Sequence, residues 1–110
     1  MTTAHPSLAA GRWQTLSLVE QFGNIGSEVG RALRWHARGE HEHSLHALDR
    51  ALELFDLTIT DPRWRTRLKE PLRAREIVCD YFFGGNTHRS TAASLEQYFM
   101  TFATAARMRR

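Results

Sequence analysis

Residues 18–33 read LVEQFGNIGSEVGRAL, and their apolar side chains recur every three or four positions. The members of this row are Leu18, Phe22, Ile25, Val29 and Leu33. Such spacing places side chains on one face of an α-helix. Since no proline occurs between residues 13 and 37, the sequence predicts a helix over that range, with Gly39 as its stop.

The same stretch carries three glycines, Gly23, Gly26 and Gly30, on a second face. A glycine inside a helix costs on the order of 1 kcal/mol relative to alanine. A helix keeps such residues where another backbone must approach closely. We therefore predict that these three glycines mark close packing against a neighbouring helix.

Two further helices are predicted from similar rows. Residues 40–60 carry Leu45, Leu48, Leu52, Phe55 and Ile59 at helical spacing. A helix near the C-terminus begins after Ser90 or Thr91, either of which can accept a capping hydrogen bond. Its apolar row consists of Leu95, Tyr98, Phe99, Phe102 and Ala106.

The third helix is predicted to run from residue 62 to about residue 83. Asp61 and Pro62 are typical of a helix start, so it should follow the second helix almost without a loop. Pro71 removes one backbone donor and should kink or break this helix. The row expected to be buried consists of Trp64, Leu68, Leu72, Cys79 and Phe83.

Four amphipathic segments joined by short connections pack as antiparallel neighbours, so the sequence predicts an all-α, up-down four-helix bundle. The 110 residues form one domain, in which residues 1–11 and 107–110 are expected to be flexible. The 42% hydrophobic and 25% charged residues exclude a wholly disordered chain. The single cysteine, the lack of a secretory signal and the lack of a membrane-length apolar run predict a cytoplasmic protein without a membrane partner.

Charge is divided between consecutive segments. Residues 40–61 hold six acidic residues against Arg50 alone, whereas residues 62–75 hold six basic residues against Glu70 alone. Three interpretations stay open. The two segments pair within one chain, or they pair head to tail between copies, or the cations bind the phosphates of RNA or DNA.

Helical geometry separates the cations into two groups. Arg65, Lys69 and Arg73 are expected to point outward and to carry any nucleic-acid contact. The cations beside the apolar row are expected to pair with acids of the second helix, within the chain or between copies. The residues of this hypothesis are Arg63, Arg67, Glu53 and Asp56.

Catalytic signals are weak. Four histidines lie close together in the sequence, but zinc needs three or four convergent ligands and the only cysteine is far away. We expect solvent-facing histidines, no metal and no cofactor. Arginine and histidine in an Arg-x4-His arrangement occur at Arg31–His36 and Arg38–His43, which resembles the motif of the HEPN ribonucleases. Chance alone gives roughly one such pair in a chain of this composition, so a nuclease is only an alternative.

Three strings resemble a known family: WQTLSLVEQFGNIGSEV at residues 13–29, LELFDLTI at residues 52–59 and LKEPLRARE at residues 68–76. They are similar to small bacterial four-helix-bundle proteins, the ribosomal-RNA intervening-sequence proteins and the accessory variability determinant (Avd) proteins of diversity-generating retroelements. The resemblance implies a homopentameric ring without catalytic activity. It also implies binding of nucleic acid and of a reverse transcriptase, as in the Avd branch.

The sequence therefore predicts a self-assembling helical bundle with a binding or scaffolding role. Its partners are expected to be copies of itself, most simply in a pentamer, and RNA, DNA or a reverse transcriptase. The alternatives are a purely structural oligomer with an unknown protein partner and a HEPN-like ribonuclease.

Overall fold

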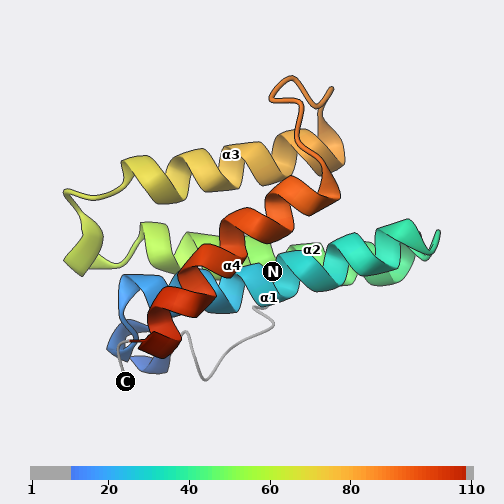
Figure 1. Ribbon diagram of the computed structural model, residues 1–110. Coiled ribbons are helices and arrows are strands. Elements are labelled where there is room, and N and C mark those ends of the chain that lie inside the picture. The colour runs from blue at the N-terminus through green and yellow to red at the C-terminus, as the bar shows by residue number, and fades with distance from the viewer. Residues whose placement is uncertain (1–10, 109–110) are drawn as a thin grey trace.

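A computed structural model describes residues 11–108, and its regular structure within this range is entirely helical (Figure 1). The four helices are α1 (Leu18–Ala37), α2 (His41–Ile59), α3 (Lys69–Phe83) and α4 (Ala92–Met108). Two short 3-10 turns, η2 (Trp13–Thr15) and η3 (Pro62–Trp64), precede α1 and α3. The prediction of an all-α chain with four helices is confirmed for the described residues.

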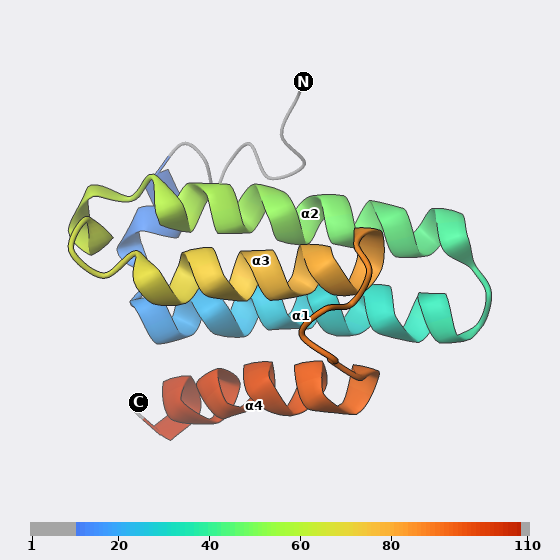
Figure 2. The ribbon, with the colours of Figure 1, turned by 90° about the horizontal axis from the view of Figure 1, so that it is seen from above.

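Consecutive helices run in opposite directions, as Figure 2 shows from above. Helix α1 packs against both α2 and α4, and α2 also contacts α3. The core between them consists mainly of side chains from α1 and α2, including Phe22, Ile25, Val29, Leu48 and Phe55. Leu95 and Phe99 of α4 close it from the other side. The arrangement is that of a four-helix bundle.

Helix α1 begins later than expected. Its start is fixed by a capping box, in which the hydroxyl of Ser17 accepts from the backbone of Glu20 at 3.2 Å, while the Glu20 carboxylate accepts from the backbone of Ser17 at 2.9 Å. The expected helical residues Trp13–Thr15 form η2 instead. The stop at Gly39 is confirmed, because this residue has a φ of 74°, which glycine adopts without strain.

The third helix differs most from the prediction. The chain makes one 3-10 turn after Asp61, leaves helical geometry, and starts α3 only at Lys69. Pro71 then lies in the first turn of α3, where no intrahelical donor is required of it. The predicted kink or break is therefore found as a complete break, and it lies before the proline and not at it.

This break also changes which face of the third helix is buried. Pro71, Ala74 and Val78 point to the core, whereas Leu72 and Phe83 of the predicted buried row are 49% and 59% exposed. The prediction assumed one continuous helix from residue 62, and the non-helical residues before Lys69 reset its phase. Apolar side chains of α3 consequently remain on the outside of the bundle.

The start of α4 matches the prediction. The hydroxyl of Thr91 accepts from the backbone of Ser94, and the hydroxyl of Ser94 accepts from the backbone of Thr91, both at 2.9 Å. Arg107 and Met108, expected to be flexible, are part of α4. The same expectation covered residues 1–11, 109 and 110. Of these, only Gly11 is among the described residues.

The glycines of α1 meet α4 in two different ways. A Cβ atom placed on Gly26 would lie 2.5 Å from Cβ of Phe99, which is impossible without movement of a helix. A Cβ atom on Gly23 would lie 3.5 Å from Cα of Ala103, an ordinary van der Waals distance. The close approach of α4 therefore requires glycine at position 26, whereas position 23 also has room for the Cβ atom of alanine.

We predict opposite effects of alanine at these two positions. Gly26→Ala should lower the free energy of unfolding, and Gly26→Leu should lower it by about 1–3 kcal/mol through overpacking. Gly23→Ala should be neutral or raise it by up to roughly 1 kcal/mol, since alanine favours the helix. Urea unfolding of the three variants measures the effect. Equal stability of the two alanine variants would contradict the contact at Gly26.

Candidate functional site

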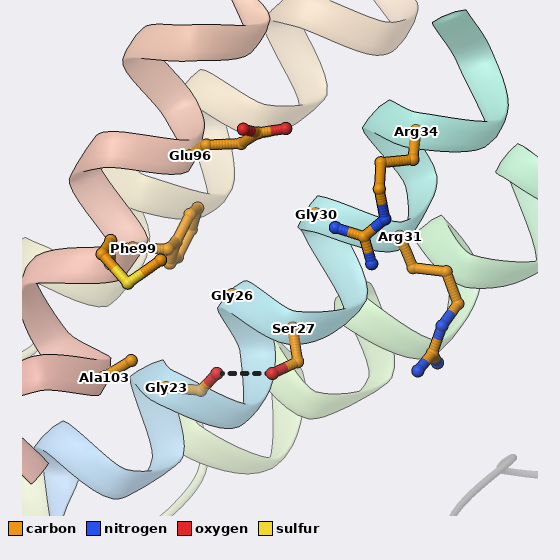
Figure 3. A pocket seen from close by; sticks show the side chains of 10 residues that line it. Gly23, Gly26, Ser27, Gly30, Arg31, Arg34, Glu96, Phe99 and Ala103 are labelled. Carbon is orange, nitrogen blue, oxygen red and sulfur yellow. Dashed lines mark hydrogen bonds between the residues drawn. The ribbon is translucent and has the colours of Figure 1, made fainter. Parts of the chain in front are cut away.

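A groove runs between α1 and α4, and Figure 3 shows its lining. Its volume is about 360 Å³, and Gly23, Gly26 and Gly30 lie along its α1 side. Met100, 53% exposed, lines it from α4. The glycines keep this side of α1 free of bulky side chains, and the groove is therefore open to a ligand or a partner.

Two arginines of α1 give the groove its charge. Arg31 donates to the carboxylate of Glu28 at 2.7 Å and is thereby partly neutralised. Arg34 forms no ion pair within residues 11–108. Glu96 of α4 is the acidic residue among those lining the groove. Because Glu28 is shared between Arg31 and Arg50, the arginines of the rim still outweigh Glu96, and the rim keeps a small positive charge.

Gly30 departs from the predicted role of the three glycines. A Cβ atom at this position would meet only a terminal nitrogen of Arg34, at 3.3 Å. No other helix of the described chain approaches it within contact distance. Close packing within one chain therefore explains Gly26 but leaves Gly30 without a reason.

A second unusual surface lies along α2 and α3. Leu72, Cys79 and Phe83 of α3 line an open depression of about 500 Å³ together with Arg75 and Glu76. On α2, Leu45 is 48% exposed. Cys79 was expected to be buried, but the phase of α3 leaves it half-buried at this surface. Exposed apolar residues gathered in one place are typical of interaction sites.

The three cations predicted to contact nucleic acid are all exposed. Lys69 and Arg73 are one turn apart at the start of α3, so they share a face. Arg65 lies before the helix begins, so the helical alignment expected between Arg65 and Lys69 is wrong. None of the three forms an ion pair within the described residues.

Within residues 11–108, neither Arg63 nor Arg67 forms the predicted ion pair with Asp56. Arg63 pairs with Asp61 at 2.7 Å, and both arginines lie over the ring of Trp64, at 4.4 and 5.7 Å from its centroid. Asp56 pairs with Arg75 instead, at 3.3 Å. The reason is again the break before Lys69, which turns residues 63–67 away from α2. Glu53 lies half-buried on α2.

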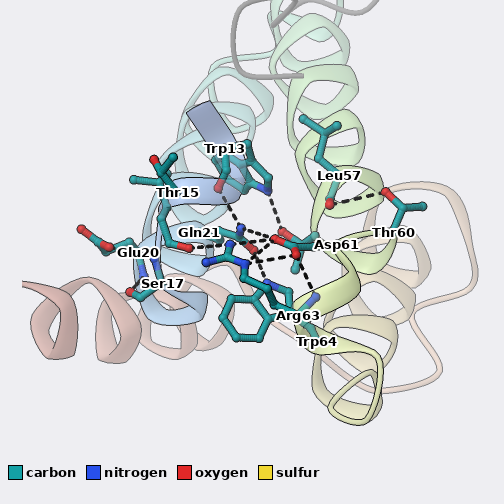
Figure 4. Close-up of polar contacts among 12 residues, drawn as sticks. Trp13, Thr15, Ser17, Glu20, Gln21, Leu57, Thr60, Asp61, Arg63 and Trp64 are labelled. Carbon is teal, nitrogen blue, oxygen red and sulfur yellow. Dashed lines mark hydrogen bonds and ion pairs between the residues drawn. The ribbon is translucent and has the colours of Figure 1, made fainter. Parts of the chain in front are cut away.

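A buried polar network holds this basic segment in place (Figure 4). The side-chain amide of Gln21 donates to the carbonyl of Trp13 at 3.0 Å and to the carboxylate of Asp61 at 3.2 Å. Its oxygen accepts from the indole of Trp64 at 3.0 Å. The indole of Trp13 donates to the hydroxyl of Thr58 at 3.1 Å. One glutamine of α1 thereby joins η2, the end of α2 and η3.

Asp61 is the charged member of this network, with only 1% of its surface exposed. Arg63 donates to its carboxylate and also to the carbonyl of Leu16, at 2.8 Å. The side-chain hydrogen bonds from Arg63 hold the pKa of Asp61 below its ordinary value of 3.8, against the opposing effect of burial. The carboxylate is therefore ionised and paired at neutral pH.

The hydroxyl of a half-buried tyrosine lies beside the predicted cations. Tyr98 of α4 donates to the carboxylate of Glu70 at 2.8 Å. Burial and this hydrogen bond raise the pKa of Tyr98, while the charge of Arg73 opposes the shift. This hydrogen bond holds the Glu70 side chain of α3 against α4. Lys69 and Arg73, which neighbour Glu70 at the start of α3, are exposed.

The two nuclease-like pairs differ in their packing. Arg31 of the first pair is bound to Glu28, while His36 packs against the rings of His41 and Phe82. In the second pair, His43 stacks on Trp35 with ring centroids 4.6 Å apart, and the guanidinium of Arg38 lies 5.5 Å from the centroid of the same ring, so both members contact Trp35. Within residues 11–108, no three histidine, cysteine or acidic side chains converge as metal ligands would.

Sequence reasoning missed two features of this site. The groove between α1 and α4 depends on how α4 crosses α1, and the α2–α3 surface depends on the phase of α3. The unexplained glycine at position 30 was the one available signal of the groove.

No helix within residues 11–108 is both long and apolar enough to cross a membrane. Comparison of the chain with protein-family models, with curated protein sequences and with solved structures finds no match.

We predict that the Asp61 network stabilises the fold in a pH-dependent manner. Because the pKa of Asp61 is lowered by folding, the carboxylate contributes stability above pH 3.8 and loses it as the pH falls further. Asp61→Asn should therefore lower the free energy of unfolding at pH 7 by roughly 1–3 kcal/mol. The difference from the wild type should shrink at pH 3.

Urea unfolding at both pH values measures this difference. Glu42→Gln is the control, because Glu42 is an exposed carboxylate in the first turn of α2 and its loss should change stability little at either pH. A difference for Asp61→Asn that is the same at pH 7 and pH 3 would show that the charge of Asp61 does not stabilise the fold.

Proposed function

We propose that this chain is a non-catalytic binding protein that associates with copies of itself and binds the backbone of a nucleic acid. The observation that carries the second part is the exposure of Arg65, Lys69 and Arg73 without carboxylate partners among residues 11–108. Cations that are not neutralised by the protein are free to replace the counterions of phosphates.

The position of these cations favours contact with a backbone over reading of bases. Arg65 lies on an exposed turn, and Lys69 and Arg73 lie in the first two turns of α3. Contacts to phosphates orient a nucleic acid but do not select its sequence. We therefore expect affinity for RNA and DNA with little sequence preference, as suits an accessory protein for an enzyme such as a reverse transcriptase.

Self-association is supported by the large apolar side chains left in solvent. Leu45, Leu72, Phe83 and Met100 are each about half-exposed or more in the single chain. Association between copies would remove them from water. A closed ring, with the pentamer implied by the family resemblance, is the form that we propose for a cytoplasmic protein of this kind.

Light scattering tests the self-association directly. At micromolar concentration and moderate salt, we expect a mass several times the 12.7 kDa of one chain, with five copies as the proposed number. A mass near 12.7 kDa under these conditions would show that the proposal of self-association is wrong.

We predict that Arg65→Ala, Lys69→Ala and Arg73→Ala, combined in one variant, weaken binding to a fluorescein-labelled DNA duplex of random sequence. Each lost phosphate contact should reduce the slope of log K against log salt by about 0.9, so the slope should fall by up to about 2.7. Fluorescence anisotropy at several salt concentrations measures both the affinity and the slope.

A charge-matched control removes three exposed arginines elsewhere: Arg38→Ala, Arg89→Gly and Arg107→Ala. Glycine is used at position 89 because its φ is 55°. This control should keep most of the wild-type slope. Equal losses of affinity and of slope in both variants would mean that only the net charge of the protein matters. If the wild-type protein does not bind the duplex at all, the alternative of a purely structural oligomer is favoured.

A further inference from the structure

Three features of the described chain have no explanation within a single copy. Gly30 lowers the stability of α1 although no neighbouring helix needs the space. Arg34 forms no ion pair within residues 11–108 although it lies at the rim of a groove. Phe83 leaves more than half of its surface in water. The first two belong to the α1–α4 groove, and the third belongs to the surface along α2 and α3.

The α2–α3 face is defined here by Leu45, Asp49, Asp56, Leu72, Glu76, Cys79 and Phe83. On α2, its three members are four and seven residues apart and so share one side of the helix. The ion pair between Asp56 and Arg75 joins this side of α2 to α3. Arg75 in turn lines the depression that contains Leu72 and Phe83. The two helices of the face therefore adjoin at this ion pair.

The face and the groove carry opposite charge. Asp49, Asp56 and Glu76 stand against Arg75 on the face, so it is net negative. The groove has Arg31 and Arg34 against Glu96 at its rim, which leaves a small positive charge, and Arg34 is not paired to any described carboxylate. Complementary charge of this kind fixes the register of an interface and disfavours contact between like faces.

Their shapes also match. A cavity of roughly 150 Å³ holds a benzene ring, and the groove is more than twice that size, at about 360 Å³. It can therefore receive a large exposed side chain such as Phe83 or Leu72. Gly30 is buried because the end of the Arg34 side chain lies over it, so such a group reaches the backbone of α1 there once the exposed Arg34 side chain moves aside. Met100 offers an apolar contact on the opposite side.

We propose that the α2–α3 face of one copy docks into the α1–α4 groove of a second copy. This inference rests on the self-association proposed above and names the two surfaces that perform it. The face and the groove lie on different helices, so the contact is heterologous. After two copies have docked, one still has a free groove and the other still has a free face, and each of these can bind a further copy. Such contacts produce rings when the rotation closes and filaments when it does not.

Two variants each disable one surface. Gly30→Trp fills the groove, and only the end of the exposed Arg34 side chain lies in its way. Leu72→Glu combined with Phe83→Glu places charge on the face at two exposed positions. Each variant alone should be monomeric by light scattering, with the helical circular dichroism of the wild type. Met108→Glu, an exposed apolar position outside both surfaces, should assemble normally.

Mixing the two disabled variants is the decisive step. One retains an intact face and the other an intact groove, so an equimolar mixture should form a dimer of about twice 12.7 kDa and nothing larger. An interface that uses the same surface on both copies would instead leave one of the two variants, the one in which that surface is intact, assembled on its own. Arg34→Glu should substitute for Gly30→Trp if tryptophan prevents folding, because it reverses the charge of the rim.

The outcomes separate the two proposals. A wild-type protein that is monomeric overturns self-association itself. A wild-type oligomer together with assembled variants, or with a mixture that stays monomeric, leaves self-association standing and overturns this assignment of the surfaces.

Discussion

The buried carboxylate of Asp61 must accept hydrogen bonds from the protein, because a buried charge without partners is costly. The end of the bundle where α1 begins and α2 ends is arranged around this requirement. Gln21 supplies one donor from α1, and Arg63 supplies the others from the turn that follows α2. The same glutamine accepts from Trp64 and donates to Trp13. Because Trp13, Gln21 and Asp61 are buried, their hydrogen bonds hold η2, α2 and η3 at one position on α1.

This constraint determines where the basic residues go. Arg63 is used to neutralise Asp61, and the chain turns away from α2 before it can continue as a helix. Pro71 then requires a new first turn, so α3 starts at Lys69. As a result, Arg65, Lys69 and Arg73 are left exposed, and the apolar residues Leu72 and Phe83 face solvent. The exposed cations and the apolar residues of the α2–α3 face are therefore both consequences of one break.

The glycines of α1 illustrate how a single pattern serves different purposes. Gly26 allows Phe99 of α4 to enter the core, and any side chain there would collide with it. Gly30 lies further along the same side, where α4 no longer approaches. The space that it leaves is part of the groove. The glycines look alike in the sequence, but their roles differ: Gly26 is needed for the packing of α4, and Gly30 belongs to the groove proposed to bind a second copy.

The sequence by itself determined the number and type of the elements, because apolar spacing, Ser17, Gly39 and Thr91 act within a few residues of the backbone that they shape. It also determined that the charge is split between residues 40–61 and 62–75. Tertiary structure decided the phase of α3, the partner of Asp56 and the difference between Gly26 and Gly30. These depend on where the chain leaves helical geometry and on how α4 crosses α1, and both follow from packing among residues far apart in the sequence.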